Sequence, residues 1–208
     1  MLFLPGCDFR CPYCHNAELV RAPLKPCPST LDDFYAHLDR RKTLISGVVI
    51  SGGEPLVHED AARIARAVRE LGLAVKLDTN GSFPSRIADI YADYVALDLK
   101  TAPAAYRRVA PGFAEAGNRV MESLAYLRSS GTEFEIRITC APGIVGDEEF
   151  REIALSLEKD DEVYLQDFRP GGCLDPAWDK VEPYPHEAMA EYLAILRRRA
   201  PRTRIRGA

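Results

Sequence analysis

Runs of aliphatic residues alternate along the chain with longer segments in which apolar side chains recur every three or four positions. The aliphatic runs are short, as strands are, and they lie at residues 2–4, 47–50, 74–77, 94–97, 133–140 and 163–166. The intervening segments show helical periodicity, for example at Ile64, Val68 and Leu71. This alternation predicts repeated strand–helix units, in which the strands form a parallel sheet covered by helices.

Capping residues and glycines mark the ends of the expected helices. One helix is expected to follow the N-cap Ser29 and to reach about Lys42, after a proline-rich connection at residues 23–28. Two others are expected to stop at Gly72 and Gly131. The remaining ones are a short helix after residue 81 and longer helices at about 147–158 and 186–199.

The fifth aliphatic run carries a polar residue at every second position. Its apolar residues Phe134, Ile136 and Ile138 alternate with Glu135, Arg137 and Thr139. Successive side chains of a strand point to opposite faces, and the apolar face of a barrel packs under its helices. The polar residues are therefore expected to face a wet or ligand-filled interior, because a small packed barrel does not normally bury an arginine.

The length of the chain limits how far such a barrel closes. Closed barrels of eight strand–helix units usually need about 250 residues, whereas this chain has 208. We therefore expect one α/β domain over residues 1–208, an open, partial (β/α)6 barrel whose first strand is shortened to Leu2–Leu4. Residues 204–206 are a candidate for a further short edge strand.

Composition excludes several classes of protein. Hydrophobic residues make up 47% and charged residues 28% of the chain, which is typical of a folded globular protein. The formal net charge of −4 provides no overall positive field for nucleic acid or anionic lipid. The apolar start, Met1 to Gly6, is too short for a signal peptide, and no apolar run is long enough to span a membrane. We expect a cytoplasmic protein.

Three cysteines, Cys7, Cys11 and Cys14, lie close together directly after the first strand. Their spacing indicates an iron–sulfur cluster held by three thiolates. In a cubane of four irons, three protein ligands leave one iron open, and an open coordination position is typical of a site that binds and transforms a ligand.

Three other interpretations of the cysteine loop compete with a cluster. Disulfides fit poorly with a chain that has no secretory leader. A zinc site with His15 as the fourth ligand is disfavoured, because the adjacent residues Cys14 and His15 would have difficulty ligating one ion tetrahedrally. An incidental grouping is the third. The remaining cysteines, Cys27, Cys140 and Cys173, show no ligand spacing and are expected to be small buried hydrophobes, with Cys173 the strongest candidate for an exception.

Polar or glycine-rich segments follow most of the expected strands. Besides the cysteine loop, these segments are 52–54, 78–80, 98–100 and 166–169. In parallel α/β folds, active sites collect at the carboxyl ends of the strands. We therefore expect the five segments to converge on one pocket.

These residues carry a resemblance to a known family. The Cys7-x3-Cys11-x2-Cys14 loop, with the aromatic Tyr13 before its third cysteine, and the later run Gly52-Gly53-Glu54-Pro55 resemble the radical S-adenosylmethionine (SAM) superfamily. Within it, four runs are most similar to the activating proteins of anaerobic ribonucleoside-triphosphate reductase. The four runs are 6–16, 77–81, 97–100 and 166–176.

The resemblance implies a cluster and a cofactor at one site. Cys7, Cys11 and Cys14 would bind a [4Fe–4S] cluster, and the amine and carboxylate of SAM would chelate its open iron. In the glycine motif, which also contains Glu54, Gly52 and Gly53 would offer backbone carbonyls to the SAM amine. Tyr13 would shield the cluster or pack on adenine.

Further SAM contacts are implied for the polar segments that follow the later strands. Asp78 and Thr79 would lie near the ribose or the SAM amine, with Asp98 and Lys100 beside them. The two aspartates would also hold a monovalent cation, as in the related pyruvate formate-lyase activators, although Asp98 and Lys100 could instead form only a salt bridge. The last two expected contacts are Arg137, which would meet the SAM carboxylate, and Arg169, which stands where those activators have a histidine.

The implied activity is that of a radical SAM oxidoreductase that activates a glycyl-radical enzyme. It cleaves SAM reductively and takes a hydrogen atom from a glycine of anaerobic ribonucleotide reductase, with electrons from a small donor protein and no catalytic side chain beyond the cluster and SAM. One alternative is a radical SAM enzyme that acts on another glycyl-radical enzyme or on a small molecule. A non-catalytic zinc-binding module is the alternative from another class.

Overall fold

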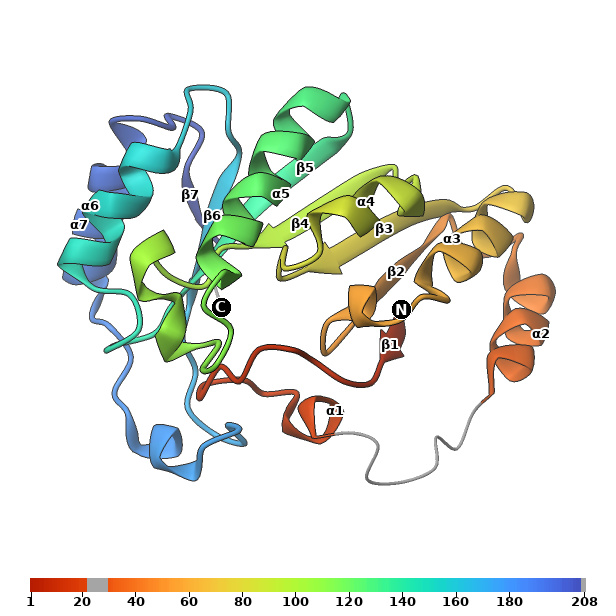
Figure 1. The fold of residues 1–208 in the computed structure, drawn as a ribbon, viewed down its shortest axis with the longest axis horizontal. Helices are drawn as coiled ribbons and strands as arrows, with labels where there is room; N and C mark the ends of the chain where they lie inside the picture. The colour runs from red at the N-terminus through yellow and green to blue at the C-terminus, as the bar shows by residue number, and fades with distance from the viewer. Residues whose placement is uncertain (22–29, 207–208) are drawn as a thin grey trace.

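The structure of the chain is a computed structural model that describes residues 1–21 and 30–206. Its centre is a seven-stranded sheet in which every strand pairs in parallel with the next strand along the chain (Figure 1). The strands are β1 (Leu2–Leu4), β2 (Gly47–Gly52), β3 (Ala74–Thr79), β4 (Tyr94–Asp98), β5 (Glu133–Cys140), β6 (Val163–Asp167) and β7 (Arg204–Arg206).

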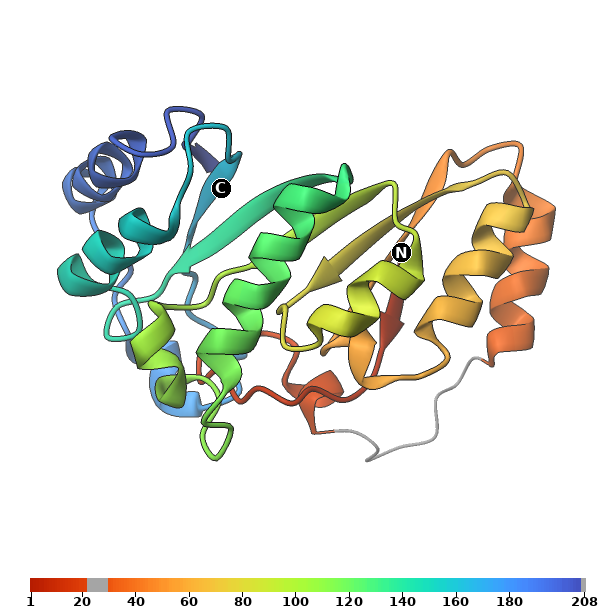
Figure 2. The same ribbon diagram turned by 45° about the horizontal axis from the view of Figure 1, so that its top comes forward.

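Helices cover one face of the sheet, whereas the short helix α1 (Ala17–Val20) lies beside the cysteine loop at the ends of the strands. The covering helices are α2 (Leu31–Arg41), α3 (Ala61–Glu70), α4 (Pro84–Ile90), α5 (Ala116–Ser130), α6 (Asp147–Ser156) and α7 (His186–Arg197). Figure 2 shows α2 to α5 in a row along the strands, and the cysteine loop running below the ends of the strands. Helices α6 and α7 pack together through Phe150 and Tyr192, whose stacked rings are 4.1 Å apart. Three short 3-10 helices lie at Pro55–Val57, Pro103–Arg108 and Pro176–Lys180.

The alternation of apolar and polar residues decides which face of each strand packs under the helices. The apolar members are almost fully buried, and they include Val48, Ile50, Val75, Leu77, Val95, Leu97, Ile136, Ile138, Val163 and Leu165. The intervening positions point to the other side, and the parallel register places Asp98 beside Arg137 and Thr139 beside Gln166. The prediction of a polar interior at β5 is confirmed, because Arg137 and Thr139 line a cavity there.

The sheet is an open α/β barrel, as expected from the length of the chain. Within the described residues, strand pairing runs from β1 to β7 without a return from β7 to β1. The shortened first strand is confirmed at three residues, and the candidate segment at 204–206 forms the edge strand β7.

Helix α2 is capped by Thr30, one residue after the expected N-cap. Asp33 N–H donates to Thr30 Oγ1 at 3.1 Å, and Thr30 N–H donates to Asp33 Oδ2 at 2.9 Å. This reciprocal capping box needs a carboxylate three residues after the cap, which Thr30 has in Asp33. Ser29, the proline-rich connection and Cys27 lie outside the described residues.

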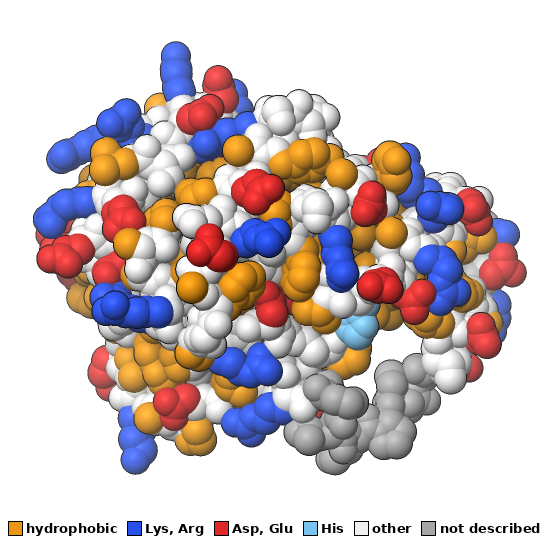
Figure 3. Space-filling model, viewed as in Figure 1, with side chains coloured by type: hydrophobic (Ala, Val, Ile, Leu, Met, Phe, Trp, Pro, Cys, Tyr) orange, Lys and Arg blue, Asp and Glu red, His pale blue; other side chains and the backbone are white. Residues whose placement is uncertain are grey.

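The outer surface carries charges of both signs. Figure 3 shows basic and acidic side chains interspersed over the face that is seen in Figure 1. Among the described residues, no helix is long and apolar enough to cross a membrane.

Candidate functional site

A cavity of about 450 Å³ opens at the carboxyl ends of the strands. It is bordered by the cysteine loop and by the segments that end or follow β2 to β6, so the predicted convergence of these segments on one pocket is confirmed. The expected site residues that line it are Cys7, Cys11, Tyr13, Cys14, Gly52, Gly53, Asp78, Thr79, Asp98, Lys100, Arg137 and Arg169. Glu54 is the expected site residue that does not line it.

The first half of the cysteine loop is anchored by Phe9. This side chain is 1% exposed and packs edge-on against Tyr106 and Phe113, at 5.8 and 6.4 Å between ring centroids. Arg10 N–H also donates to the carbonyl of Val109 at 2.6 Å. The buried Phe9 side chain and this backbone hydrogen bond thereby fix the chain between the first two cysteines.

The second half of the loop is held by the segment that follows β6. Leu174 N–H donates to the carbonyl of Cys14 at 2.8 Å, and Asp175 N–H donates to that of Pro12 at 3.0 Å. The position of the third cysteine therefore depends on residues near the other end of the chain.

Aromatic side chains close the same junction. Tyr13 lies 5.8 Å from Trp178 and 6.5 Å from Phe168 between ring centroids, and Phe168 lies 5.7 Å from Trp178. Beside them, His15 Nε2 is 2.7 Å from the carbonyl oxygen of Arg169. Rings at these distances attract one another, so this side of the cavity is closed by an aromatic cluster.

Gly52 and Gly53 allow two backbones to approach closely. A Cβ atom on Gly52 would lie 2.1 Å from the carbonyl oxygen of Leu4, and one on Gly53 would lie 2.0 Å from that of Gly6. Gly53 N–H donates to Leu4 O at 3.0 Å, and Asn16 Nδ2 donates to Gly52 O at 3.1 Å. Only glycine fits at both positions, since any side chain would push the start of the cysteine loop away.

Glu54 lies beneath the cavity wall, fully buried. Its carboxylate accepts hydrogen bonds from Leu56 N–H at 3.0 Å, Thr79 Oγ1 at 2.8 Å and Asn80 N–H at 2.6 Å. Burial raises its pKa to about 8, although the three donors act in the opposite direction. Glu54 thus joins the loop after β2 to the loop after β3 and acts as a structural support of the site.

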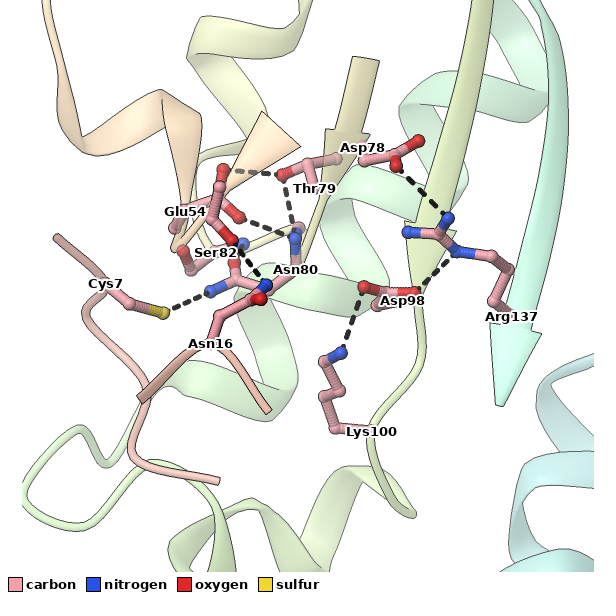
Figure 4. Close-up of polar contacts among 12 residues, drawn as sticks. Cys7, Asn16, Glu54, Asp78, Thr79, Asn80, Ser82, Asp98, Lys100 and Arg137 are labelled. Atoms are coloured by element: carbon pink, nitrogen blue, oxygen red, sulfur yellow. Dashed lines mark hydrogen bonds and ion pairs between the residues drawn. The ribbon is translucent and has the colours of Figure 1, made fainter. Parts of the chain in front are cut away.

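Asp98 is the centre of an ion-pair chain on the cavity wall (Figure 4). Its carboxylate is 2.8 Å from Arg137 Nε and 3.0 Å from Lys100 Nζ, and Arg137 Nη1 is 3.3 Å from Asp78 Oδ2. Burial opposes ionisation of Asp98, but the two cations outweigh it and hold its pKa at about 2. The wall therefore presents two carboxylates and two cations that are already paired with one another.

Cys11 is buried, whereas Cys7 and Cys14 are partly exposed. Burial raises the pKa of Cys7 to about 12 and that of Cys11 to about 11, and the nearby Lys100 partly offsets the effect at Cys11. In the part of the chain that the structure describes, no three His, Cys, Asp or Glu side chains are grouped as a site for a single metal ion. The three cysteines nevertheless line one cavity, which has room for a larger group.

Several residues of the site were not singled out from the sequence. Asn16, Asn80, Thr139 and Gln166 line the cavity as well. Thr139 carried a signal in the β5 alternation, and Asn80 lies inside the polar segment that follows β3. Asn16 carried none, because its role depends on the loop folding back toward Gly52.

The other two described cysteines are outside the cavity lining. Cys140 is a core residue at the end of β5, 1% exposed. Cys173 is buried in the loop after β6, where its N–H donates to Asp179 Oδ1 at 2.9 Å. Both are free thiols.

The chain is similar in sequence to proteins that carry two different names. It is 30% identical to a protein of Methanocaldococcus jannaschii that is provisionally named a glycyl-radical enzyme activating enzyme, over 90% of this chain and 79% of that protein. It is also 35% identical to a 7-carboxy-7-deazaguanine synthase of Synechocystis, over 39% of this chain and 37% of that one.

The fold and the family model agree with these relatives. A crystal structure of SuiB from Streptococcus suis superposes with a TM-score of 0.70 at 19% identity, over 98% of this chain and 47% of that one. The model of the radical SAM superfamily matches residues 1–179, which contain every residue of the cavity lining. A match over most of the chain, together with the cysteine loop and its cavity, leads to one conclusion: the chain belongs to the radical SAM superfamily.

Proposed function

We propose that this protein is an activase that installs a glycyl radical on anaerobic ribonucleotide reductase. The observation that supports the chemistry most directly is that three cysteines, two glycines and a chain of ion pairs from separate segments line one cavity. Membership of the superfamily implies a [4Fe–4S] cluster and SAM. The relative that is provisionally named a glycyl-radical enzyme activating enzyme supports the class of target.

The described residues fit such a cluster and cofactor. In this proposal Cys7, Cys11 and Cys14 hold three irons, and the carbonyls of Gly52 and Gly53 accept hydrogen bonds from the SAM amine. When bound, the cluster would supply one electron for the reductive cleavage of SAM to methionine and a deoxyadenosyl group able to take the glycine hydrogen. The volume of about 450 Å³ is within the range of cofactor pockets.

The ion-pair chain orients the cofactor in this proposal. Arg137 uses Nε and Nη1 for Asp98 and Asp78, and its remaining N–H groups are donors for the SAM carboxylate. The same two aspartates are the candidate ligands of a monovalent cation. Lys100 pairs with Asp98 and also places a positive charge near the sulfur of Cys11, where it favours the thiolate.

Aromatic side chains keep water from the reacting atoms. Phe9, Tyr13 and Phe168 all line the cavity and are at most 6% exposed. A dry wall strengthens the electrostatic contacts inside the site and protects a reactive radical from side reactions.

Metal analysis and SAM cleavage test the chemistry. Protein reconstituted anaerobically is expected to bind about four irons and four sulfides per chain, and to form 5′-deoxyadenosine when SAM and a reductant are added. The variant Cys11→Ser is the control and is expected to lose both properties. Colourless protein that binds zinc and does not cleave SAM would instead support a non-catalytic zinc module and refute the proposal.

A second experiment tests the target. Reduced, SAM-loaded protein is mixed with an anaerobic ribonucleotide reductase, and electron paramagnetic resonance is used to look for a glycine-centred radical. SAM cleavage without this signal would point to another glycyl-radical enzyme or to a small molecule. The partial match to 7-carboxy-7-deazaguanine synthases supports a small molecule as the second candidate.

A further inference from the structure

Asn80 is a cavity residue whose backbone N–H and side-chain amide both form hydrogen bonds. It follows directly after β3 and is 5% exposed. Its N–H donates to Glu54 Oε2 at 2.6 Å, and its Oδ1 accepts a hydrogen bond from Ser82 N–H at 2.9 Å. Its Nδ2 lies 2.9 Å from Asp8 Oδ1 and 3.9 Å from Cys7 Sγ, as Figure 4 shows for the contact with Cys7.

The orientation of the Asn80 amide follows from its neighbours. Ser82 N–H can only donate, so the atom that it meets must be the amide oxygen. The amide nitrogen is therefore on the side of Cys7 and Asp8. The amide nitrogen donates to the Asp8 carboxylate and, at a longer distance, to the sulfur of Cys7.

The position of the amide is fixed from below by Glu54. This buried carboxylate binds Asn80 N–H and the Thr79 hydroxyl, and it binds Leu56 N–H on its own loop. Asn80 has little freedom to move away from Cys7, because its backbone N–H is bonded to Glu54 in the loop after β2 and its side chain to the backbone of Ser82. A donor held in this way needs no reorganisation when charge on the sulfur changes.

A hydrogen bond to a ligating sulfur changes the redox properties of a cluster. Reduction adds negative charge that is shared with the thiolates, so an N–H donor stabilises the reduced form more than the oxidised form. Asn80 Nδ2 lies beside a direct contact in which Cys7 Sγ donates to Asp8 Oδ1 at 4.0 Å. A thiolate at Cys7 would be repelled by that carboxylate, and the amide limits this repulsion because it donates to the same carboxylate oxygen.

We propose that Asn80 is a positioning residue that holds Cys7 in place and, through its amide N–H, raises the reduction potential of the cluster. The proposal rests on the proposed function, since it requires a cluster on Cys7. In this proposal, a residue of the loop after β3 tunes the reduction potential of the cluster and does not bind SAM.

The test compares the midpoint potential of the reconstituted cluster in the parent protein and in three variants. Asn80→Leu removes both donors at similar volume. Asn80→Asp keeps the acceptor for Ser82 N–H but replaces the donor by a second carboxylate. Ser82→Ala is the matched control, because the Ser82 hydroxyl is buried without a hydrogen-bond partner in the described chain and only the Ser82 backbone contacts Asn80.

We expect Asn80→Leu to lower the ratio of reduced to oxidised cluster, at a fixed potential, by roughly threefold to tenfold, the size of one ordinary hydrogen bond. A tenfold change corresponds to a shift of about 59 mV for a one-electron couple. Asn80→Asp should shift the potential further down, and Ser82→Ala should leave it unchanged. Loss of iron from a variant with parental thermal stability would also support the positioning role.

One result would refute the proposed function, and a different one would refute the role of Asn80. If the parent protein itself binds no iron–sulfur cluster, the proposed function fails. If the parent binds it and Asn80→Leu and Asn80→Asp keep the parental potential and iron content, the inference about Asn80 is wrong while the proposed function stands. Should Asn80→Leu not fold, the isosteric Asn80→Asp decides by the same readout.

Discussion

Replacing Gly53 with alanine tests whether contact between two backbones positions the cysteine loop. The added Cβ would lie 2.0 Å from Gly6 O and 3.1 Å from Cys7 Cβ, whereas real Cβ contacts essentially never fall below 3.0 Å. The backbone around Gly6 must therefore move by about 1 Å, which is the difference between the 2.0 Å contact and the shortest contact that real Cβ atoms make, 3.0 Å. That movement stretches the bonds of Gly53 N–H to Leu4 O and of Glu54 N–H to Gly6 O, now 3.0 and 2.8 Å.

The expected cost follows from these contacts. Two weakened backbone hydrogen bonds at about 1 kcal/mol each, together with strain in the loop, give a loss of roughly 2 to 4 kcal/mol in the free energy of unfolding. Because Cys7 moves with Gly6, the variant is also expected to retain less iron than the parent.

Urea unfolding and iron analysis of Gly53→Ala check both effects. The matched control is Gly146→Ala, whose Cβ would meet no atom closer than the flexible Glu149 carboxylate at 3.4 Å. We expect the control to stay within about 1 kcal/mol of the parent. Parental stability and parental iron content in Gly53→Ala would refute the argument that this close approach positions the loop.

Three further substitutions probe other parts of the structure. The pKa of Glu54 in the folded chain, about 8, lies above its ordinary value of 4.5. The free energy of unfolding of the parent should therefore fall as the pH rises from about 5 to 8. Urea unfolding of Glu54→Gln should no longer show this dependence on pH. A flat parental profile would mean that Glu54 is ionised throughout. Asp161→Asn should cost roughly 1 to 3 kcal/mol in the same assay, because Arg128 loses the charge of the nearly buried Asp161 at 2.5 Å and keeps only the exposed Glu158 at 3.1 Å as an ion-pair partner; parental stability would contradict this. Trp178→Leu should make bound cluster bleach faster in air, since it opens the ring contact with Tyr13, and an unchanged bleaching rate would show that the ring shields nothing.

Much of the site could be predicted because its residues follow strands of a parallel sheet. The period-two pattern at β5 identified Arg137 as an inward-facing residue, and the cysteine spacing marked the loop before any contact was known. The partners of Arg137 were not predictable in the same way. Whether its guanidinium meets a ligand or two carboxylates depends on the register that places it beside Asp98 and near Asp78.

Long-range contacts account for the rest. Glu54 belongs to a motif next to the cavity, and only its three buried donors reveal that its carboxylate turns away from the cavity. Similarly, Arg206 on β7 forms two bonds to Glu135 on β5, at 3.0 and 2.6 Å, and so reaches across the strand between them. Nothing local to either residue indicates such a pair, because 71 positions separate them in the chain.

The anchoring of the cysteine loop bears on the order in which the protein is made. Each strand pairs with its neighbour in sequence, so most of the sheet can assemble while synthesis continues. His15, however, contacts Arg169, 154 positions later, and the carbonyl of Cys14 accepts a hydrogen bond from Leu174 N–H. The thiols thus reach their final arrangement only after the loop that follows β6 has left the ribosome, and chains arrested before it are expected to react faster with alkylating reagents at Cys14. Assembly of the metal centre therefore belongs to the finished polypeptide and not to the nascent one.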